Sequence, residues 1–145
     1  MDIKEYLALP HRFMWGGDGR PHRADPNGFF YNDCTTFCAT WVEMQIGVDP
    51  AKDLRGTYRT EDGAHAILGA AGGIIPFMAG KLEPLGFKRV QNPVDGDIGV
   101  IHAIAGLGFS TDIAALRFGP LWACLGRNGV AAKKAEFLAA WSLPS

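Results

Sequence analysis

The chain has 145 residues, of which 48% are hydrophobic and 20% are charged, a balance that is typical of a globular domain and excludes disordered and coiled-coil proteins. The 14 basic and 15 acidic residues leave a formal charge of -1, so the sequence predicts no nucleic-acid partner and no membrane partner. We expect a single domain that spans residues 1–145.

The N-terminal half shows helical patterns separated by turn residues. In chain order we expect a helix over residues 2–9, a loop over 11–32, and helices over 33–46, 61–71 and 75–81. The pattern is strongest over 33–46, where Phe37 and Trp41 recur at helical spacing. Asp33 is a good N-terminal cap for this helix and Gly47 a good stop signal.

The C-terminal half changes to apolar runs that are typical of strands. In chain order we expect a strand over residues 97–105, a bend at 106–108, strands over 112–118 and 121–125, a tight turn at 127–129 and a helix over 133–141. The last helix would place three apolar residues, Phe137, Leu138 and Trp141, on one face. Helices followed by an antiparallel meander predict an α+β fold.

The chain carries no sign of export. Its first ten residues lack a basic segment followed by an apolar core, and no apolar run reaches the ~18 residues that a membrane helix needs. Three cysteines do not suit a disulfide scaffold. We therefore expect synthesis and folding in a reducing cytoplasm.

Cys34 is the main candidate for chemistry. It lies in the first turn of the strongest predicted helix, where the helix dipole and the free N–H groups favour a thiolate. A thiolate is a nucleophile, and the same N–H groups can stabilise an oxyanion. The alternative is that Cys34 is a small buried apolar residue, which is the usual role of a free cysteine.

The order of motifs resembles the NlpC/P60 superfamily of papain-like cysteine peptidases. The shared motifs are Phe13-x-Trp15-Gly16, then Asp33-Cys34, then Pro93-x-x-Gly96-Asp97-Ile98. The sequence is also similar to a small phage-associated branch of that superfamily, whose further motifs match Gly47-Val48-Asp49-Pro50 and Leu54-Arg55-Gly56-Thr57-Tyr58-Arg59-Thr60. The resemblance implies a papain-like fold, in which the Asp-Cys helix packs on a C-terminal antiparallel sheet.

The resemblance also implies a catalytic histidine at the start of the second sheet strand, facing Cys34. The matching segment here, residues 112–119, has no histidine and places Asp112 or Ile113 at that position. His102, on the first predicted strand, is the candidate base, with a core or hairpin-end histidine as the alternative. Surface or packing roles suffice for the other histidines, which are His11, His22 and His65.

No cofactor and no metal are expected. Cys34, Cys38 and Cys124 lack the paired loop spacing of a structural zinc site. The basic residues are scattered, which is typical of a solvated surface. Arg55, Tyr58 and Arg59 form a denser cluster that is either a contact surface or an exposed loop.

Two functions follow from the resemblance. One is a structural or adaptor protein of a phage tail that has kept a papain-like fold without catalysis, a pseudoenzyme. It would be made in the host cytoplasm, join the virion tail and contact other phage tail proteins. The other is an active cysteine endopeptidase or amidase that uses Cys34, and His102 as the base, to cleave the peptide stems of peptidoglycan during entry.

Overall fold

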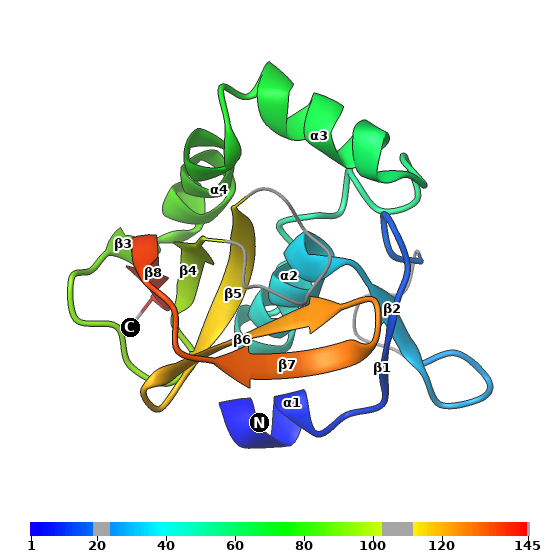
Figure 1. Ribbon diagram of the computed structural model, residues 1–145, viewed down its shortest axis with the longest axis horizontal. Coiled ribbons are helices and arrows are strands. Elements are labelled where there is room, and N and C mark those ends of the chain that lie inside the picture. Colours follow the sequence, from blue (N-terminus) through cyan, green and yellow to red (C-terminus); the bar gives the residue numbers. More distant parts are fainter. Residues whose placement is uncertain (19–23, 103–111, 145) are drawn as a thin grey trace.

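The computed structural model describes residues 1–18, 24–102 and 112–144 and has the α+β architecture that the sequence predicts (Figure 1). The N-terminal elements are α1 (Ile3–Leu7), β1 (His11–Phe13), β2 (Phe30–Asn32), α2 (Cys34–Ile46), α3 (Glu61–Ala70), α4 (Ile74–Leu82) and the 3-10 turn η1 (Glu83–Leu85). The main sheet consists of β3 (Lys88–Arg89), β4 (Ile98–Ile101), β5 (Ile113–Phe118), β6 (Leu121–Gly126), β7 (Gly129–Lys133) and β8 (Phe137–Ser142).

The six strands of the main sheet are all antiparallel to their neighbours, in the order β3-β8-β4-β5-β6-β7. Strands β4 to β6 form the predicted meander, in which Leu116 of β5 lies between Ile98 and Ala123. Strand β7 extends it beyond the predicted turn at 127–129, where the sequence predicts no strand. The predicted strand over 97–105 is observed as β4, and its last residues and the bend at 106–108 lie outside the described residues.

The prediction of a helix over residues 133–141 is wrong, because most of this segment is strand β8. It fills the space between β3 and β4, and Val100 of β4 lies opposite Ala139. Ala139 and Trp141 belong to the core beneath α2, whereas Ala140 packs in a second cluster. The backbone pairing of β8 satisfies the second edge of β4, and both faces of β8 are buried; together these gains override the helical propensity of an alanine-rich segment.

The prediction of a loop over residues 11–32 is also incomplete, because its two ends pair with each other. Strands β1 and β2 run parallel, with His11 beside Phe30. The Phe30 amide donates to the Pro10 carbonyl, and the Met14 amide donates to the Asn32 carbonyl. Strands of three residues are too short to show an alternating pattern, so tertiary pairing rather than the local sequence defines them.

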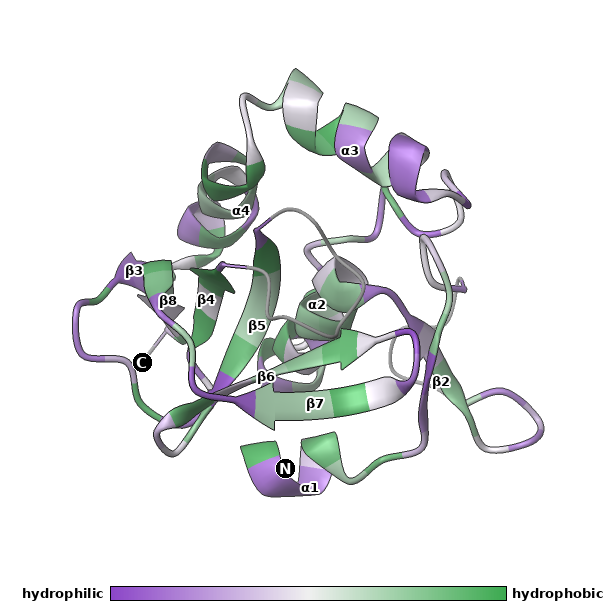
Figure 2. Cartoon of the chain, in the orientation of Figure 1, coloured by the Kyte–Doolittle hydropathy of each residue, from purple (hydrophilic) through white to green (hydrophobic). Residues whose placement is uncertain are grey.

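Helix α2 packs against the sheet and forms the core of the molecule. Phe37, Trp41 and Val42 lie on its buried face, as the sequence predicts. They share one cluster with apolar residues of β4 and β5, including Ile98 and Leu116. The hydropathy colouring shows these strands as largely apolar (Figure 2).

Helices α3 and α4 lie together at one end of the molecule (Figure 1). Gly72 and Gly73, which connect them, have φ values of 92° and 119°. Helix α3 has no buried residue in the described part of the chain, so it covers the core without entering it. Among the described residues no single helix is long and apolar enough to cross a bilayer. Helix α3 and the segment α4–η1 together reach the necessary length and apolar composition, but they are bent by 73° at the break between them.

We predict that Trp41→Ala lowers the free energy of unfolding by about 3–5 kcal/mol, because it leaves a cavity between α2 and the sheet. Trp41 is 2% exposed, and its Nε1–H donates to the Gly96 carbonyl at 2.8 Å. Urea denaturation monitored by circular dichroism measures the loss. Leu138→Ala, at an exposed position of β8, is the control and should change stability by less than about 0.5 kcal/mol. A similar loss in both variants would contradict the assignment of Trp41 to the core.

Candidate active site

The start of α2 is held by a complete capping box. Asp33 is the cap, and its Oδ1 accepts hydrogen bonds from the amides of Thr35 at 3.0 Å and Thr36 at 2.8 Å. The Thr36 hydroxyl accepts the amide of Asp33 in return. These bonds satisfy two of the free N–H groups of the first turn. The predicted cap residue is confirmed, and Cys34 is the first residue of the helix.

The second oxygen of Asp33 receives two further donors from distant parts of the chain. The Gly16 amide donates to Oδ2 at 3.0 Å, and the Tyr58 hydroxyl donates to the same atom. Gly16 has a φ of 79°, and a Cβ there would lie 2.2 Å from the Tyr58 carbonyl oxygen. Only glycine fits this position, which accounts for the aromatic-glycine motif that the sequence shows before Asp33.

Cys34 is buried at this helix start, with 7% of its surface exposed. Burial raises the pKa of the Cys34 thiol well above its ordinary value, and the negative charge of Asp33 and the neighbouring Cys124 raise it further. The helix dipole alone favours the opposite direction. Cys34, however, packs among apolar side chains, including Ile113 and Ala115, where an anion loses its hydration, and this position corresponds to the buried alternative that the sequence leaves open.

A cavity of about 30 Å³ borders Cys34, which is room for about one water molecule. The residues that line it come from the segment after β1, the start of α2, α3, the first residue of α4 and the start of β5. They are Trp15, Asp33, Cys34, Thr35, Glu61, Ala64, His65, Leu68, Ile74, Asp112 and Ile113. The cavity therefore brings together a thiol, carboxylates and one imidazole.

The residues at the start of β5 lie where the resemblance implies a histidine. Asp112 and Ile113 both line the cavity beside Cys34. An aspartate cannot readily accept a thiol proton and return it near neutral pH, unless its pKa is strongly raised.

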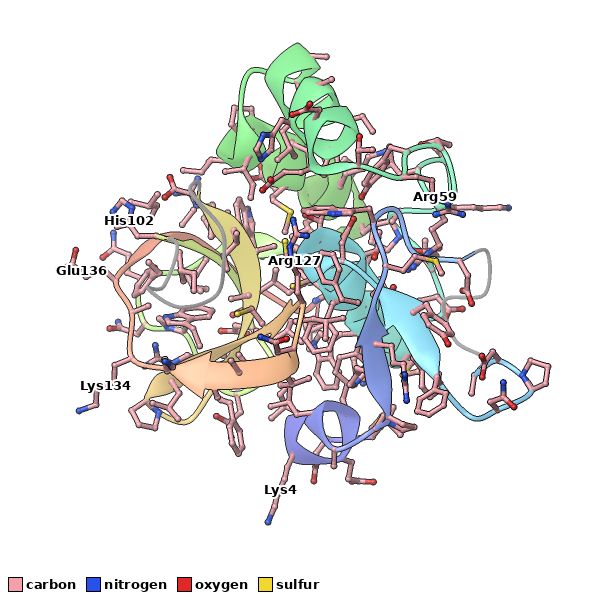
Figure 3. All side chains as sticks on the ribbon, turned by 45° about the vertical axis from the view of Figure 1, so that its right-hand side comes forward. Lys4, Arg59, His102, Arg127, Lys134 and Glu136 are labelled. Carbon is pink, nitrogen blue, oxygen red and sulfur yellow. The ribbon has the colours of Figure 1, made fainter. Side chains whose placement is uncertain are left out.

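His102, the predicted base, follows the end of β4 and points away from the interior (Figure 3). Its side chain is 58% exposed, and its Nδ1 lies 2.9 Å from Asp112 Oδ1. His102 is not among the described residues that line the cavity. The structure therefore gives it the hairpin-end position that the sequence left as an alternative.

The imidazole that does line the cavity belongs to His65 on α3. Its Nε2 lies 4.0 Å from Glu61 Oε2, one turn earlier on the same helix. The sequence alone predicts a surface or packing role for His65, because nothing local connects residue 65 with residue 34. Only the position of α3 over the start of α2 brings the two residues to one cavity.

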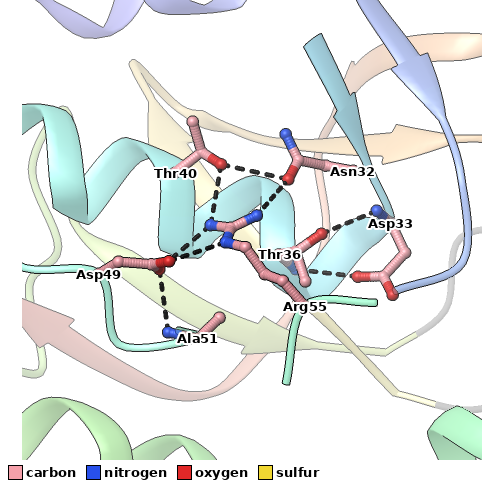
Figure 4. Close-up of polar contacts among 7 residues, drawn as sticks. All are labelled: Asn32, Asp33, Thr36, Thr40, Asp49, Ala51 and Arg55. Atoms are coloured by element: carbon pink, nitrogen blue, oxygen red, sulfur yellow. Dashed lines mark hydrogen bonds and ion pairs between the residues drawn. The ribbon is translucent and has the colours of Figure 1, made fainter. Parts of the chain in front are cut away.

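Arg55 is buried beneath the same helix start, which corrects the expectation of a solvated or contact-surface side chain (Figure 4). Its guanidinium bonds both oxygens of Asp49, at 2.8 and 3.1 Å. It also donates to Asn32 Oδ1 at 2.8 Å and to Thr40 Oγ1 at 3.1 Å. We call Arg55, Asp49, Asn32 and Thr40 the Arg55 clamp.

The segment after Arg55 continues around the helix start. Tyr58 reaches Asp33, and burial followed by the charge of Asp33 raises the pKa of Tyr58 above its ordinary value, so Tyr58 remains a donor. Arg59 donates to the carbonyls of Trp15 at 2.9 Å and Gly17 at 2.7 Å. Thr60 then caps α3. The segments 47–50 and 54–60 are thus joined by the contact between Arg55 and Asp49.

No group of three or more metal-ligating side chains occurs in residues 1–18, 24–102 and 112–144. Cys34, Cys38 and Cys124 are all free thiols, and burial raises the pKa of Cys124 to about 11.

Comparison with known proteins gives one match. The model of a family described as a domain of unknown function, DUF6950, matches residues 20–143. Neither the curated proteins nor the solved structures contain a match.

We predict that Arg55→Met lowers the free energy of unfolding by about 3–5 kcal/mol, because it leaves the buried Asp49 carboxylate without its cation. Arg12→Met is the control, since Arg12 is an exposed arginine that stacks on Phe29, and it should cost less than about 1 kcal/mol. The double variant Asp49→Asn with Arg55→Met should be more stable than Arg55→Met alone. Equal losses in Arg55→Met and Arg12→Met would contradict the clamp.

We predict that Cys34 reacts with iodoacetamide at least about tenfold more slowly in the folded protein than in urea at pH 8, because burial disfavours the thiolate.

The raised pKa of Cys34 also predicts a pH dependence of the free energy of unfolding. The folded protein keeps the Cys34 proton, whereas the unfolded chain releases it near pH 9. The stability that the neutral Cys34 thiol contributes is therefore fully present below about pH 9 and is lost progressively as the pH rises above it. In Cys34→Ala the alkaline loss of stability should be smaller than in the parent chain. Mass spectrometry of the labelled protein and urea titrations between about pH 8 and 10.5 measure both effects.

Proposed function

We propose that this chain, which belongs to the DUF6950 family, a domain family of unknown function, is a structural or adaptor protein of a phage tail. In this proposal the chain has a papain-like fold of the NlpC/P60 kind and is a pseudoenzyme. It joins the virion tail through contacts with other tail proteins and does not hydrolyse peptides.

One observation carries the proposal. Asp112 and Ile113, at the start of β5, line the cavity beside Cys34, while the exposed His102 lies 2.9 Å from Asp112 and is not among the described residues that line that cavity. A cysteine peptidase needs a base within about 2.6–3.2 Å of the thiol, or one water away, and an acid that protonates the leaving amine. Neither Asp112 nor Ile113 can supply both functions near neutral pH.

The state of Cys34 supports the same conclusion. Its thiol is buried and its pKa is raised, so the nucleophilic form is scarce at neutral pH. The cavity beside it is small, about 30 Å³.

The architecture supports a papain-like fold. A helix that begins with the cysteine packs on an antiparallel sheet, and the start of the second meander strand faces that cysteine. The Arg55 clamp supports the link to the phage-associated branch, because it joins the two motifs that distinguish this branch.

A second function is favoured by one specific observation. His65 and Glu61 line the cavity of Cys34, and their side chains lie 4.0 Å apart. If α3 moved toward Cys34, this pair could supply an imidazole from a direction that the NlpC/P60 resemblance does not imply. The chain would then be the cysteine endopeptidase or amidase acting on peptidoglycan stem peptides.

The test is a cell-wall assay with the purified chain. We predict that it releases no peptides from peptidoglycan at neutral pH, as measured by mass spectrometry of the soluble fraction. In the phage that encodes it, Cys34→Ala should leave the yield of complete tails unchanged, since it removes little volume. Arg55→Ala should lower that yield, because the variant loses the clamp.

Turnover that disappears in Cys34→Ala would overturn the scaffold proposal. Loss of that turnover in His65→Ala but not in His102→Ala would assign the base to α3, and the reverse result would assign it to His102.

A further inference from the structure

Helix α3 forms one wall of the Cys34 cavity and also the outer edge of the molecule (Figure 1). Four residues of α3 line this cavity of about 30 Å³, and they are Glu61, Ala64, His65 and Leu68. Cys34 lines the same cavity from the first turn of α2. A displacement of α3 would therefore open this side of the cavity to solvent.

The packing of α3 holds it weakly. None of its ten residues, all of which the structure describes, is buried. Ile67 and Leu68 reach the main core only as partly buried side chains. The next helix, α4, by contrast buries Phe77, Met78 and Leu82. Segments with little buried apolar surface are the first to open in a folded protein.

The sequence of α3 gives the helix little stability of its own. Its ten residues are fewer than an isolated helix needs in water. Gly63 and Gly69 lie within the helix, where glycine is less favourable than alanine. Gly72 and Gly73, which have φ values of 92° and 119°, then separate α3 from α4. The loss of helical structure in α3 therefore need not spread into α4.

An exposed ion pair joins α3 to the sheet. Arg127, in the β6–β7 turn, places its Nη2 4.0 Å from Glu61 Oε1. Its guanidinium lies 5.6 Å from the ring of Trp15, which lines the Cys34 cavity together with Glu61. The side chain of Arg127 is 54% exposed, and an ion pair between exposed groups adds little stability. This contact positions α3 over Cys34 but resists its opening only slightly.

We propose that α3 is a lid over Cys34, which unfolds locally and exposes the thiol while α2, α4 and the sheet stay folded. The local stability of α3 then determines access to Cys34, and the stability of the whole domain does not. The lid follows from the packing of α3 and does not depend on the proposed function, because a chain that hydrolyses nothing would open in the same way.

The experiment measures how fast iodoacetamide labels Cys34 and Cys124 in the full chain, from zero urea to just below the unfolding transition, by mass spectrometry of peptides. Cys124 has no exposed surface and is not among the described residues that line the cavity beneath α3. We expect the labelling rate of Cys34 to depend weakly on urea, because local opening exposes little surface. The labelling rate of Cys124 should rise steeply, because its exposure requires global unfolding.

Substitutions at exposed positions change the stability of α3 and leave the cavity lining intact. Ala66→Gly should speed the labelling of Cys34 about fivefold, and Gly69→Ala should slow it about threefold. Gly80→Ala, in α4, is the matched control and should leave the Cys34 rate unchanged, since a Cβ at either glycine meets open space. Arg127→Gln should speed the labelling about twofold, because it removes the exposed ion pair.

Three outcomes would overturn the lid. Equal Cys34 rates in Ala66→Gly, Gly69→Ala and the parent chain would mean that the thiol reacts in the closed protein. Equal slowing by Gly69→Ala and Gly80→Ala, or a urea dependence as steep as that of Cys124, would mean that only global unfolding exposes Cys34. Amide hydrogen exchange of the parent chain decides the matter if a variant does not fold. Residues 64–70 should exchange faster than residues 77–82, and equal exchange would mean that α3 and α4 open as one unit.

Discussion

The buried guanidinium of Arg55 is the interaction on which the arrangement around Cys34 depends. It connects the end of β2, the middle of α2 and the turn after α2 through Asn32, Thr40 and Asp49. Burying this charge costs several kcal/mol unless its donors are matched, and the four contacts match four of its five N–H donors. Because Arg55 is fixed, the segment that follows it can reach Asp33 through Tyr58 and the first turn of α2 keeps its geometry.

The state of Cys34 shows two electrostatic effects in opposition. The N-terminus of a helix stabilises a negative charge by about 0.3–1 kcal/mol, which lowers a pKa by less than about one unit. Full burial raises a thiol pKa by several units, and a neighbouring carboxylate adds to that. Burial therefore determines the protonation of Cys34, and its first-turn position alone does not make a nucleophile.

The sequence predicted the elements whose signals are local. The helix that begins after Asp33 and ends before Gly47 is observed with these boundaries, because its cap, its apolar spacing and its stop signal all lie within it. Strand β8 could not be predicted, since its alanine-rich segment becomes a strand only beside the free edge of β4. The same limit applied to the site. Cys34 and its cap were predicted from neighbouring residues, whereas the burial of Arg55 and the approach of His65 depend on elements that meet only in the folded chain.

The position of β8 also determines when the protein can fold during synthesis. Strand β4 pairs with β5 on one side and with β8 on the other, so its second edge stays open until residues 137–142 have left the ribosome. An open apolar edge is a template for pairing with another chain, and pairing between distant segments slows folding. A nascent chain that has completed the meander is therefore exposed to aggregation until β8 arrives. Slow translation or a stop before residue 137 would prolong that interval, and chaperone binding to β4 would be most useful within it.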